Sequence, residues 1–292
     1  MKPIKFSIFG ADCFTCQMPR IKDAMQNLGH ILSEESPDLI YANDPTGYSK
    51  ALNLKKKFPD SYLVFIFLDV PWHMPKVEQQ TKLLVEHFLS KSDATTTISL
   101  KVKEDLSKFL NKKVDVIYNP IKDVFYDESV KKENSFLYVG RANDPIKRIK
   151  LLRETLLKTK NGLNEIIICG SENPGFGNYL NVVPDAKLNK LYNSSKYLFL
   201  PSKAEGLGLT MIEAMICGSL PIACSDNKTA KEFLPEDFIC EPNPQSMFDK
   251  IEELNKEYET KRNLVLKYGK KYKIQFDKKS IAKNILNIFY SR

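Results

Sequence analysis

The stretch that decides the fold is YLFLPSKAEGLGLTMIEAMICGSLPIAC, residues 197–224. Residues 197–201 are aromatic or aliphatic up to a proline and predict a buried strand. Residues 210–217 have helical character, and residues 220–224 predict a second short strand. A strand, a helix and another strand within about 30 residues form the repeating unit of a parallel sheet covered by helices.

The same alternation continues on both sides of this stretch. In the first half we expect strands at 4–9, 38–42, 62–70, 94–99 and 114–118, with helices at 18–28, 76–89 and 101–110. In the second half we expect strands at 136–140 and 165–170, and helices at 149–158, 185–193, 245–257, 262–276 and 280–290. We therefore predict an α/β fold of two Rossmann-like parallel-sheet domains, with a ligand at the strand carboxyl ends facing the cleft between them.

The length of 292 residues exceeds what one hydrophobic core usually supports, so two domains are expected. We place the first at 1–125 and the second at 134–279. Residues 126–134 are polar and are interpreted as a linker.

The net charge of +8 is unevenly distributed, with +1 over residues 1–133 and +7 over 134–292. Such an excess is typical of a polyanion-binding protein, but it also arises from lysines on solvated helix faces. No basic stretch is interleaved with aromatic residues, so a nucleic-acid partner is not favoured. The chain shows neither a signal-peptide pattern nor an apolar run of about 18 residues, and we expect a cytoplasmic protein with at most weak peripheral contact with anionic lipid.

Six cysteines in a chain without a signal peptide do not indicate a disulfide framework. Cys13 and Cys16 form a Cys-x-x-Cys between an expected strand and an expected helix. This pattern fits a thiol oxidoreductase, half of a zinc site, or two small apolar side chains. No second pair completes a zinc site, and we favour the apolar interpretation.

Two glutamates flank the turn that follows the strand at 197–201. Gly206 and Gly208 let a ligand approach the backbone, and the first N–H groups of the next helix favour an anion. Thr210 and Glu213 have the spacing of a capping box, so Glu213 is either a helix cap or a ligand contact. Glu205 is either a solvated loop residue or a ligand contact.

The chain from Pro201 to Ile222 reads Pro-Ser-x-x-Glu-Gly-x-Gly-Leu-x-x-x-Glu-Ala-Met-x-x-Gly-x-x-Pro-Ile. It resembles the signature of retaining GT-B glycosyltransferases of family 4, also called glycosyl transferases group 1. Arg141 and Lys147, which follow the first expected strand of the second half, agree with the same family, as does Asn119-Pro120-Ile121 more weakly.

The resemblance implies a role for each matching residue. Arg141 and Lys147 would hold the donor diphosphate, together with the backbone N–H groups of Gly208, Leu209 and Thr210. Glu213 would bind the donor ribose, and Glu205 the donor sugar or its neighbouring phosphate. The chemistry is consistent, because charge grows on phosphate oxygens as the glycosidic bond lengthens, and fixed cations stabilise that charge. Lys147 could otherwise belong to a solvated basic cluster with Arg148 and Lys150.

Other candidate positions are less specific. The resemblance implies that the chain binds the nucleobase near Val183, although Val182 and Val183 could equally be a buried apolar pair. His73 is the candidate residue near the reacting carbon, with Asp69 orienting it; both could instead be ordinary loop residues. Gly10 is all that remains of the glycine pair that the family commonly has after its first strand.

The resemblance thus implies transfer of a sugar from a UDP- or GDP-sugar to a glycan, lipid-linked or other acceptor, with retention of configuration and without an obligatory metal or other cofactor. It also implies that the helix at 280–292 packs back on the first domain. The alternatives are an inactive nucleotide-sugar-binding homologue, a glycosyltransferase that modifies nucleic acid, and the thiol oxidoreductase. The nucleobase, the sugar and the acceptor are not specified by the sequence.

Overall fold

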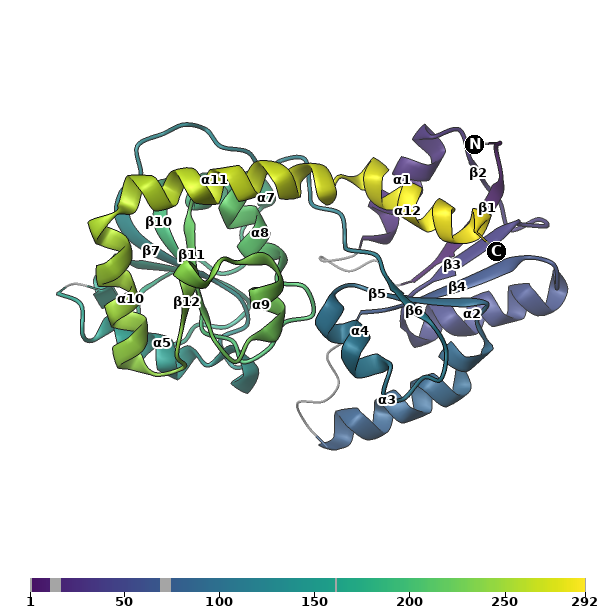
Figure 1. The fold of residues 1–292 in the computed structure, drawn as a ribbon, viewed down its shortest axis with the longest axis horizontal. Coiled ribbons are helices and arrows are strands. Elements are labelled where there is room, and N and C mark those ends of the chain that lie inside the picture. Colours follow the sequence, from purple (N-terminus) through teal and green to yellow (C-terminus); the bar gives the residue numbers. More distant parts are fainter. Residues whose placement is uncertain (1, 11–16, 69–74, 161, 292) are drawn as a thin grey trace. The chain divides into compact units, whose positions relative to one another are not determined.

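The computed structural model describes the chain except residues 1, 11–16, 69–74, 161 and 292 (Figure 1). Two compact units are present. Unit 1 comprises Met1–Pro120 and Gln275–Arg292, and unit 2 comprises Ile121–Ile274. Each contains one six-stranded sheet in which every strand pairing is parallel, as predicted.

The sheet of unit 1 has the strand order β2-β1-β3-β4-β5-β6. Its strands are β1 (Lys5–Phe9), β2 (Ile31–Leu32), β3 (Leu39–Ala42), β4 (Tyr62–Phe67), β5 (Ala94–Thr97) and β6 (Val114–Val116). The helices are α1 (Met18–Asn27), α2 (Asp44–Lys57), α3 (Pro75–His87), the short η2 (Leu89–Lys91), α4 (Leu100–Leu106) and α12 (Lys278–Tyr290). The central strands β3 and β4 are almost entirely buried, as expected for a parallel sheet covered on both faces.

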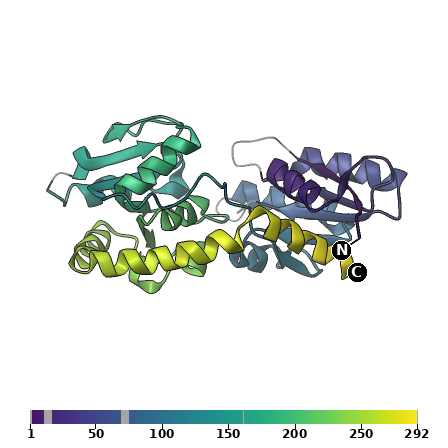
Figure 2. The ribbon, with the colours of Figure 1, turned by 90° about the horizontal axis from the view of Figure 1, so that it is seen from above.

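The last helix of the chain, α12, completes the core of unit 1 (Figure 2). It packs against α1 and buries Ile281, Ala282, Ile285, Leu286 and Phe289. The Phe289 ring meets the Tyr62 ring edge-on at 6.0 Å. The Lys278 amine lies 2.9 Å from the Asp23 carboxylate of α1. Strands from the start of the chain therefore share a core with its last helix.

Helix α2 was missed from the sequence, because its pattern is weak. Its first turn contains Pro45 and Gly47, and its last turn is Lys55-Lys56-Lys57. The buried side is narrow and consists of Gly47, Tyr48 and Ala51. A side chain at position 47 would lie 2.9 Å from the Phe9 carbonyl oxygen, so the glycine allows α2 to approach the end of β1.

The sheet of unit 2 has the order β12-β11-β10-β7-β8-β9. Its strands are β7 (Glu133–Val139), β8 (Ile166–Cys169), β9 (Asn178–Tyr179), β10 (Ser195–Leu200), β11 (Leu220–Cys224) and β12 (Ile239–Cys240). The α-helices are α5 (Ile149–Leu156), α6 (Gly162–Glu165), α7 (Asp185–Ser194), α8 (Leu209–Ile216), α9 (Lys228–Phe233), α10 (Pro244–Lys256) and α11 (Tyr258–Gln275). Two short 3₁₀ helices complete it, η3 (Pro145–Lys147) and η4 (Glu236–Phe238).

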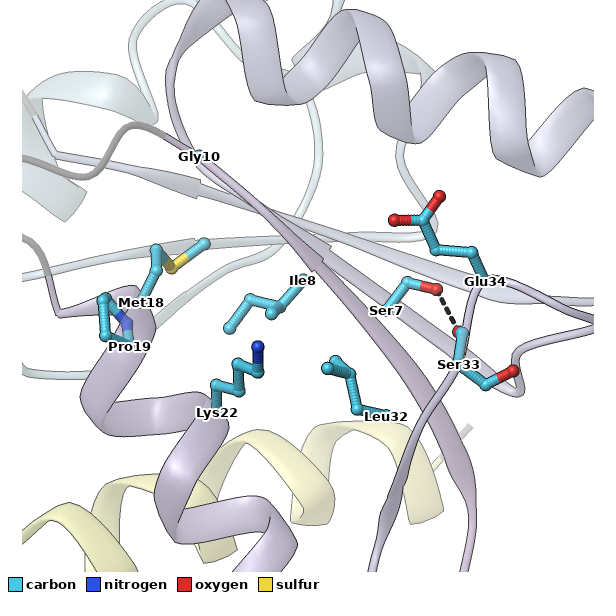
Figure 3. A pocket seen from close by; sticks show the side chains of 9 residues that line it. All are labelled: Ser7, Ile8, Gly10, Met18, Pro19, Lys22, Leu32, Ser33 and Glu34. Carbon is cyan, nitrogen blue, oxygen red and sulfur yellow. Dashed lines mark hydrogen bonds between the residues drawn. The ribbon is translucent and has the colours of Figure 1, made fainter.

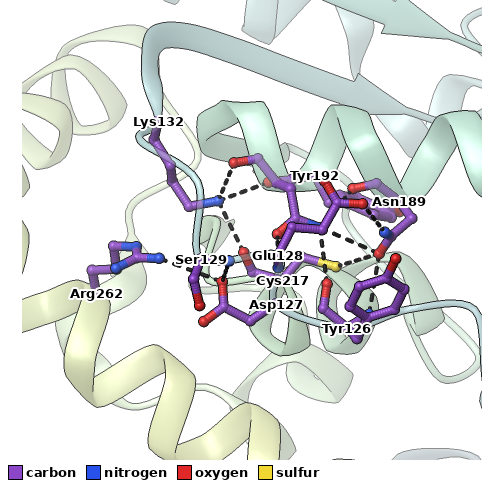
Figure 4. A network of polar contacts seen from close by, with 10 residues as sticks. Tyr126, Asp127, Glu128, Ser129, Lys132, Asn189, Tyr192, Cys217 and Arg262 are labelled. Carbon is purple, nitrogen blue, oxygen red and sulfur yellow. Dashed lines mark hydrogen bonds and ion pairs between the residues drawn. The ribbon is translucent and has the colours of Figure 1, made fainter.

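The interpretation of residues 126–134 as a linker is wrong, because this segment is anchored to unit 2 (Figure 4). The Lys132 side chain is only 9% exposed, and its amine donates hydrogen bonds to the carbonyl oxygens of Tyr192, Asn193 and Cys217, each at 2.9 Å. These carbonyls belong to the carboxyl ends of α7 and α8. One lysine therefore satisfies carbonyls that two helix ends leave without partners.

The buried Lys132 amine is expected to make the stability of the protein depend on pH. Burial, with Arg262 nearby, lowers its pKa from 10.5 to about 8. Between these values the unfolded chain keeps a proton that the folded chain has released, so raising the pH favours the folded state. The difference in free energy of unfolding between the wild type and Lys132→Met should therefore change in favour of the wild type by up to about 3 kcal/mol from pH 8 to pH 10.5. Urea titrations of both proteins at several pH values measure this; a constant difference would contradict it.

Strands β7 and β8 approach each other closely where they end. A side chain at Gly170 would lie 2.0 Å from the Gly140 carbonyl oxygen. Gly170→Ala must therefore push the two strand ends apart, and we expect a loss of about 1–3 kcal/mol in the free energy of unfolding. Ser171→Ala, at the exposed neighbouring position, is the matched control in the same urea titration. Equal stability of the two variants would refute the prediction.

Candidate functional site

The candidate site of unit 2 lies at the carboxyl edge of its sheet, where open α/β sheets bind ligands. It is built by the loops that follow β7, β10 and β11. The backbone N–H of Lys203, after β10, donates to the Ile146 carbonyl after β7 at 2.9 Å. Asn227, after β11, donates to the Ser202 hydroxyl at 3.3 Å. These bonds join the three loops.

Lys147 and Glu205, which are 58 residues apart in the chain, form an ion pair in this edge. The Lys147 amine lies 2.6 Å from one Glu205 carboxylate oxygen and 2.8 Å from the other. Both side chains are largely buried, with exposed fractions of 20% and 16%. Thr229 donates to the Glu205 backbone carbonyl at 2.7 Å and fixes the loop. The structure therefore brings together two residues that the sequence analysis selected separately.

Arg141 presents its guanidinium at the same edge and remains open to solvent. Its side chain is 68% exposed and makes an ion pair of 2.7 Å with Asp144. Asp144 also accepts a hydrogen bond from the Ile146 N–H at 3.0 Å and caps the short helix η3 that carries Lys147. Because Asp144 contacts both the arginine and this helix, it fixes Arg141 relative to Lys147.

Arg148 is not part of a solvated basic cluster. It has a left-handed backbone with φ of 50° between η3 and α5, and its guanidinium pairs with both carboxylate oxygens of Asp226. The hydrogen bonds to Asp226 raise the pKa of Arg148. The three cations Arg141, Lys147 and Arg148 therefore face three carboxylates. The excess positive charge of the second half is not concentrated at this edge.

The turn after β10 supplies backbone donors. Gly208 precedes α8 with φ of 75°, a left-handed conformation that favours glycine. Leu209 and Thr210 are the first helical residues, so their N–H groups have no carbonyl partner within the helix. The capping-box interpretation is wrong: the N-cap is Gly208 and no side chain caps the helix.

Glu213 lies one turn into α8 with its side chain turned inward. The residue is 8% exposed, and its carboxylate accepts a hydrogen bond of 3.1 Å from the Tyr192 hydroxyl. Burial, and then the nearby Glu213 charge, raise the pKa of Tyr192 well above 10.0, which keeps this hydroxyl a donor. A buried carboxylate in this position can accept further hydrogen bonds from ligand hydroxyl groups.

Val182 and Val183 are not a buried apolar pair. Val182 is 53% exposed and Val183 is half-buried. Asn181, just before them, has a left-handed backbone, and its side chain accepts a hydrogen bond of 2.7 Å from the Val182 N–H. The loop therefore exposes a valine without contributing it to the core.

In unit 1, Gly10 lines a cavity of about 450 Å³ between β1 and α1 (Figure 3). The Lys22 amine projects into this cavity, and Glu34 lies across it. A side chain at Gly10 would lie 1.6 Å from the Asn43 side-chain oxygen, so any other residue would have to displace the buried Asn43 side chain. Gly10 was a candidate from the sequence, but the cavity could not be predicted, because Lys22 and Glu34 are not close in the chain.

Some sequence-based candidates lie outside the described residues: Asp69, His73, Cys13 and Cys16. Within the described residues, no three His, Cys, Asp or Glu side chains are grouped so that they could hold a metal ion. No helix in the described part of the chain is long and apolar enough to cross a membrane.

Residues 122–272, which make up almost all of unit 2, match the family Glycosyl transferases group 1. The match covers more than half of the chain, and the protein belongs to this family. The two parallel six-stranded sheets are those of the GT-B fold.

Several individual proteins are also similar to this chain. The O-antigen chain mannosyltransferase RfbU of Salmonella typhimurium is 26% identical over 236 residues, which are 72% of this chain and 62% of RfbU. The chain thus spans about three fifths of that relative. HepE of Anabaena, solved with UDP and glucose, has a TM-score of 0.75 at 16% identity over 99% of this chain and 100% of HepE. A glycosyltransferase of Rickettsia africae has a TM-score of 0.77 at 15% identity, over 100% and 99%.

Proposed function

We propose that this protein is a glycosyltransferase that moves a sugar from a nucleotide-diphosphate sugar to a glycan or lipid-linked acceptor. The observation that carries the proposal is the Lys147–Glu205 pair beside Arg141, within the region that matches the family. Two fixed cations and an open glycine turn at one sheet edge suit a diphosphate ligand. RfbU is called a mannosyltransferase and HepE was solved with UDP, which makes GDP-mannose and UDP-sugars the first donors to test.

In this proposal the leaving group is the nucleoside diphosphate. As the glycosidic bond breaks, negative charge develops on the phosphate oxygens. The Arg141 guanidinium provides paired donors, Lys147 provides a compact charge, and the Leu209 and Thr210 N–H groups provide neutral donors. These groups are already in place before the reaction, so they stabilise the developing charge without reorganising.

Glu205 has a distinct place in the proposal. Its carboxylate is held at both oxygens by Lys147, so a bound diphosphate and Glu205 share one ammonium group. Three ammonium hydrogens allow this sharing. Lys147 would thereby fix Glu205 beside the donor sugar, whose hydroxyl groups can donate to the carboxylate. Glu213 would bind the ribose hydroxyls from α8, and the chain near Val183 would contact the nucleobase.

The stereochemistry and the first-unit residues complete the proposal. We propose retention of configuration without an obligatory metal, as in family 4, with a donor phosphate oxygen helping to accept the acceptor proton. His73 and Asp69 would lie near the reacting carbon. The cavity between Gly10 and Lys22 is the candidate acceptor position in unit 1.

A thermal-shift series with UDP, GDP, ADP and their sugars tests the proposal. We expect one nucleotide to raise the melting temperature of the protein and Arg141→Ala to abolish that shift. Arg153→Ala, a substitution on α5 outside the three loops, is the matched control. No shift with any nucleotide would refute the proposed function.

Glu213→Gln tests the ribose contact. It keeps the size of the side chain and one acceptor oxygen for Tyr192, but removes the charge that strengthens bonds from ligand hydroxyls. We expect the nucleotide dissociation constant to increase by about 10-fold. Isothermal titration with the nucleotide and with its 2′-deoxy analogue measures this. If Glu213 binds the ribose, removal of the 2′-hydroxyl should reduce the affinity for the nucleotide less in the variant than in the wild type. Equal reductions in the two proteins would contradict the contact.

A further inference from the structure

Two cysteines lie on neighbouring strands of unit 2, and neither has been assigned above to the donor. Cys224 ends β11 and is directly paired with Cys240 of β12 in the parallel register. Both are free thiols and both are buried. The Cys224 thiol donates to the Pro201 carbonyl oxygen and the Cys240 thiol to the Ala223 carbonyl oxygen, each at 3.5 Å. Paired residues on adjacent strands point to the same face of a sheet.

The spacing of such a pair permits a disulfide. Neighbouring strands lie about 4.8 Å apart, which is within the range of about 4.4–6.8 Å between Cα atoms that a disulfide requires. Strand β12 has two residues and lies at the edge of the sheet, so it has a neighbour on one side only. A small adjustment of this short edge strand can therefore accommodate the bond.

One of the two cysteines lines a cavity. Cys240 lines a cavity of about 340 Å³. The wall of this cavity also contains two lysines and four carboxylate side chains: Lys231, Lys250, Glu236, Glu241, Asp249 and Glu253. A cavity of this size accepts a small molecule, and its mixed charges suit one that carries both amino and carboxylate groups. Cys224 lies behind Cys240, since it does not line this cavity and has no exposed surface.

The surroundings also favour a thiolate on the inner sulfur. The neighbouring Cys240 lowers the pKa of Cys224, and the nearby Arg148 guanidinium acts in the same direction, whereas Cys224 and burial raise the pKa of Cys240. A thiolate is the form that attacks a disulfide. The Cys224 sulfur is therefore suited to attack a mixed disulfide that forms on Cys240.

We propose that Cys224 and Cys240 are a redox-active dithiol that a small disulfide oxidises through this cavity. The Cys240 sulfur, after passing its proton to solvent, attacks the external disulfide RSSR, forms Cys240–S–S–R and releases RS⁻. The Cys224 thiolate then attacks the Cys240 sulfur, forms the Cys224–Cys240 bond and releases the second RS⁻. The two thiol protons end on the two released thiolates, so RSSR is reduced to two RSH while the pair is oxidised.

The test uses the full chain in a Cys13→Ser/Cys16→Ser background, because these two cysteines could form a disulfide of their own. The folded protein is incubated with oxidised glutathione, quenched with N-ethylmaleimide and analysed by intact mass and peptide mapping. We expect two fewer alkylated thiols, no adduct, and a cross-link between the peptides of Cys224 and Cys240. A cross-link elsewhere, or none, would overturn the proposal.

Single variants in this background separate the two steps. Cys224→Ala should accumulate a glutathione adduct on Cys240, because the resolving thiolate is gone. Cys240→Ala should leave Cys224 unmodified, because it cannot be reached. Cys169→Ala, another buried cysteine, should behave like the parent, and thermal melting verifies that each variant is folded. An unmodified Cys240 in folded Cys224→Ala would also overturn the proposal. No readout depends on nucleotide binding, so this result is independent of the proposed function.

Discussion

Lys147→Ala is expected to lower the rate of sugar transfer by about 10²- to 10³-fold, the usual loss when a fixed group that stabilises developing charge is removed. Two effects combine. The leaving diphosphate loses a cation, and the Glu205 carboxylate, which is 16% exposed, loses the amine that holds both of its oxygens. A largely buried carboxylate without its partner would also repel the diphosphate. The measurement is the initial rate with the donor that the thermal-shift series identifies.

Lys150→Ala is the matched control, because Lys150 is exposed on α5, three residues along the chain. It removes the same charge from the same region and should leave the rate within about twofold. A double variant, Lys147→Ala with Glu205→Gln, separates the two effects. If repulsion by Glu205 contributes, the double variant should recover part of the nucleotide affinity that Lys147→Ala loses. A rate for Lys147→Ala equal to that of the control would exclude the diphosphate role.

Leu286→Ala is expected to lower the free energy of unfolding of unit 1 by about 2–5 kcal/mol. Leu286 has no exposed surface and lies on the buried face of α12, beside Ile285 and Phe289. Its truncation leaves a cavity where the last helix meets the rest of unit 1. Removing residues 278–292 altogether should abolish the cooperative unfolding of unit 1, since each buried aliphatic or aromatic side chain contributes about 1.5–3 kcal/mol.

Urea denaturation followed by hydrogen exchange measures these changes, because exchange assigns each transition to one unit. Lys283→Ala, an exposed position on the same helix, is the control and should change stability by less than about 0.5 kcal/mol. If the chain without residues 278–292 retained protection in β3 and β4, α12 would not be required for the core of unit 1.

The sequence predicted best those segments where local pattern and burial agree. Residues 220–224 were predicted as a strand, and β11 has these same limits. All five of its residues are apolar, and polar or glycine residues flank them on both sides, namely Gly218-Ser219 before and Ser225-Asp226 after, so the pattern marks the limits of the strand. Helix α2 failed this condition, because its lysine-rich surface and its early proline and glycine hide a narrow buried side.

The partners of the site cations could not be predicted in the same way. Asp226 is 78 residues from Arg148 in the chain, and only the sheet order brings β11 beside the loops that follow β7 and β10. Lys132 shows the same limit. A polar segment looks like a linker in composition, and nothing in its spacing reveals that one amine will meet three helix-end carbonyls.

The division of unit 1 into two stretches of chain sets the order in which the units can be completed during synthesis. Unit 2 is continuous from Ile121 to Ile274, so it can fold once that residue has left the ribosome. The strands of unit 1 must wait for α12, which follows unit 2 in the chain, before their core is complete. Until then the surface that α12 covers, on α1 and at Tyr62, stays open, and in this interval the nascent chain is exposed to aggregation and to chaperone binding.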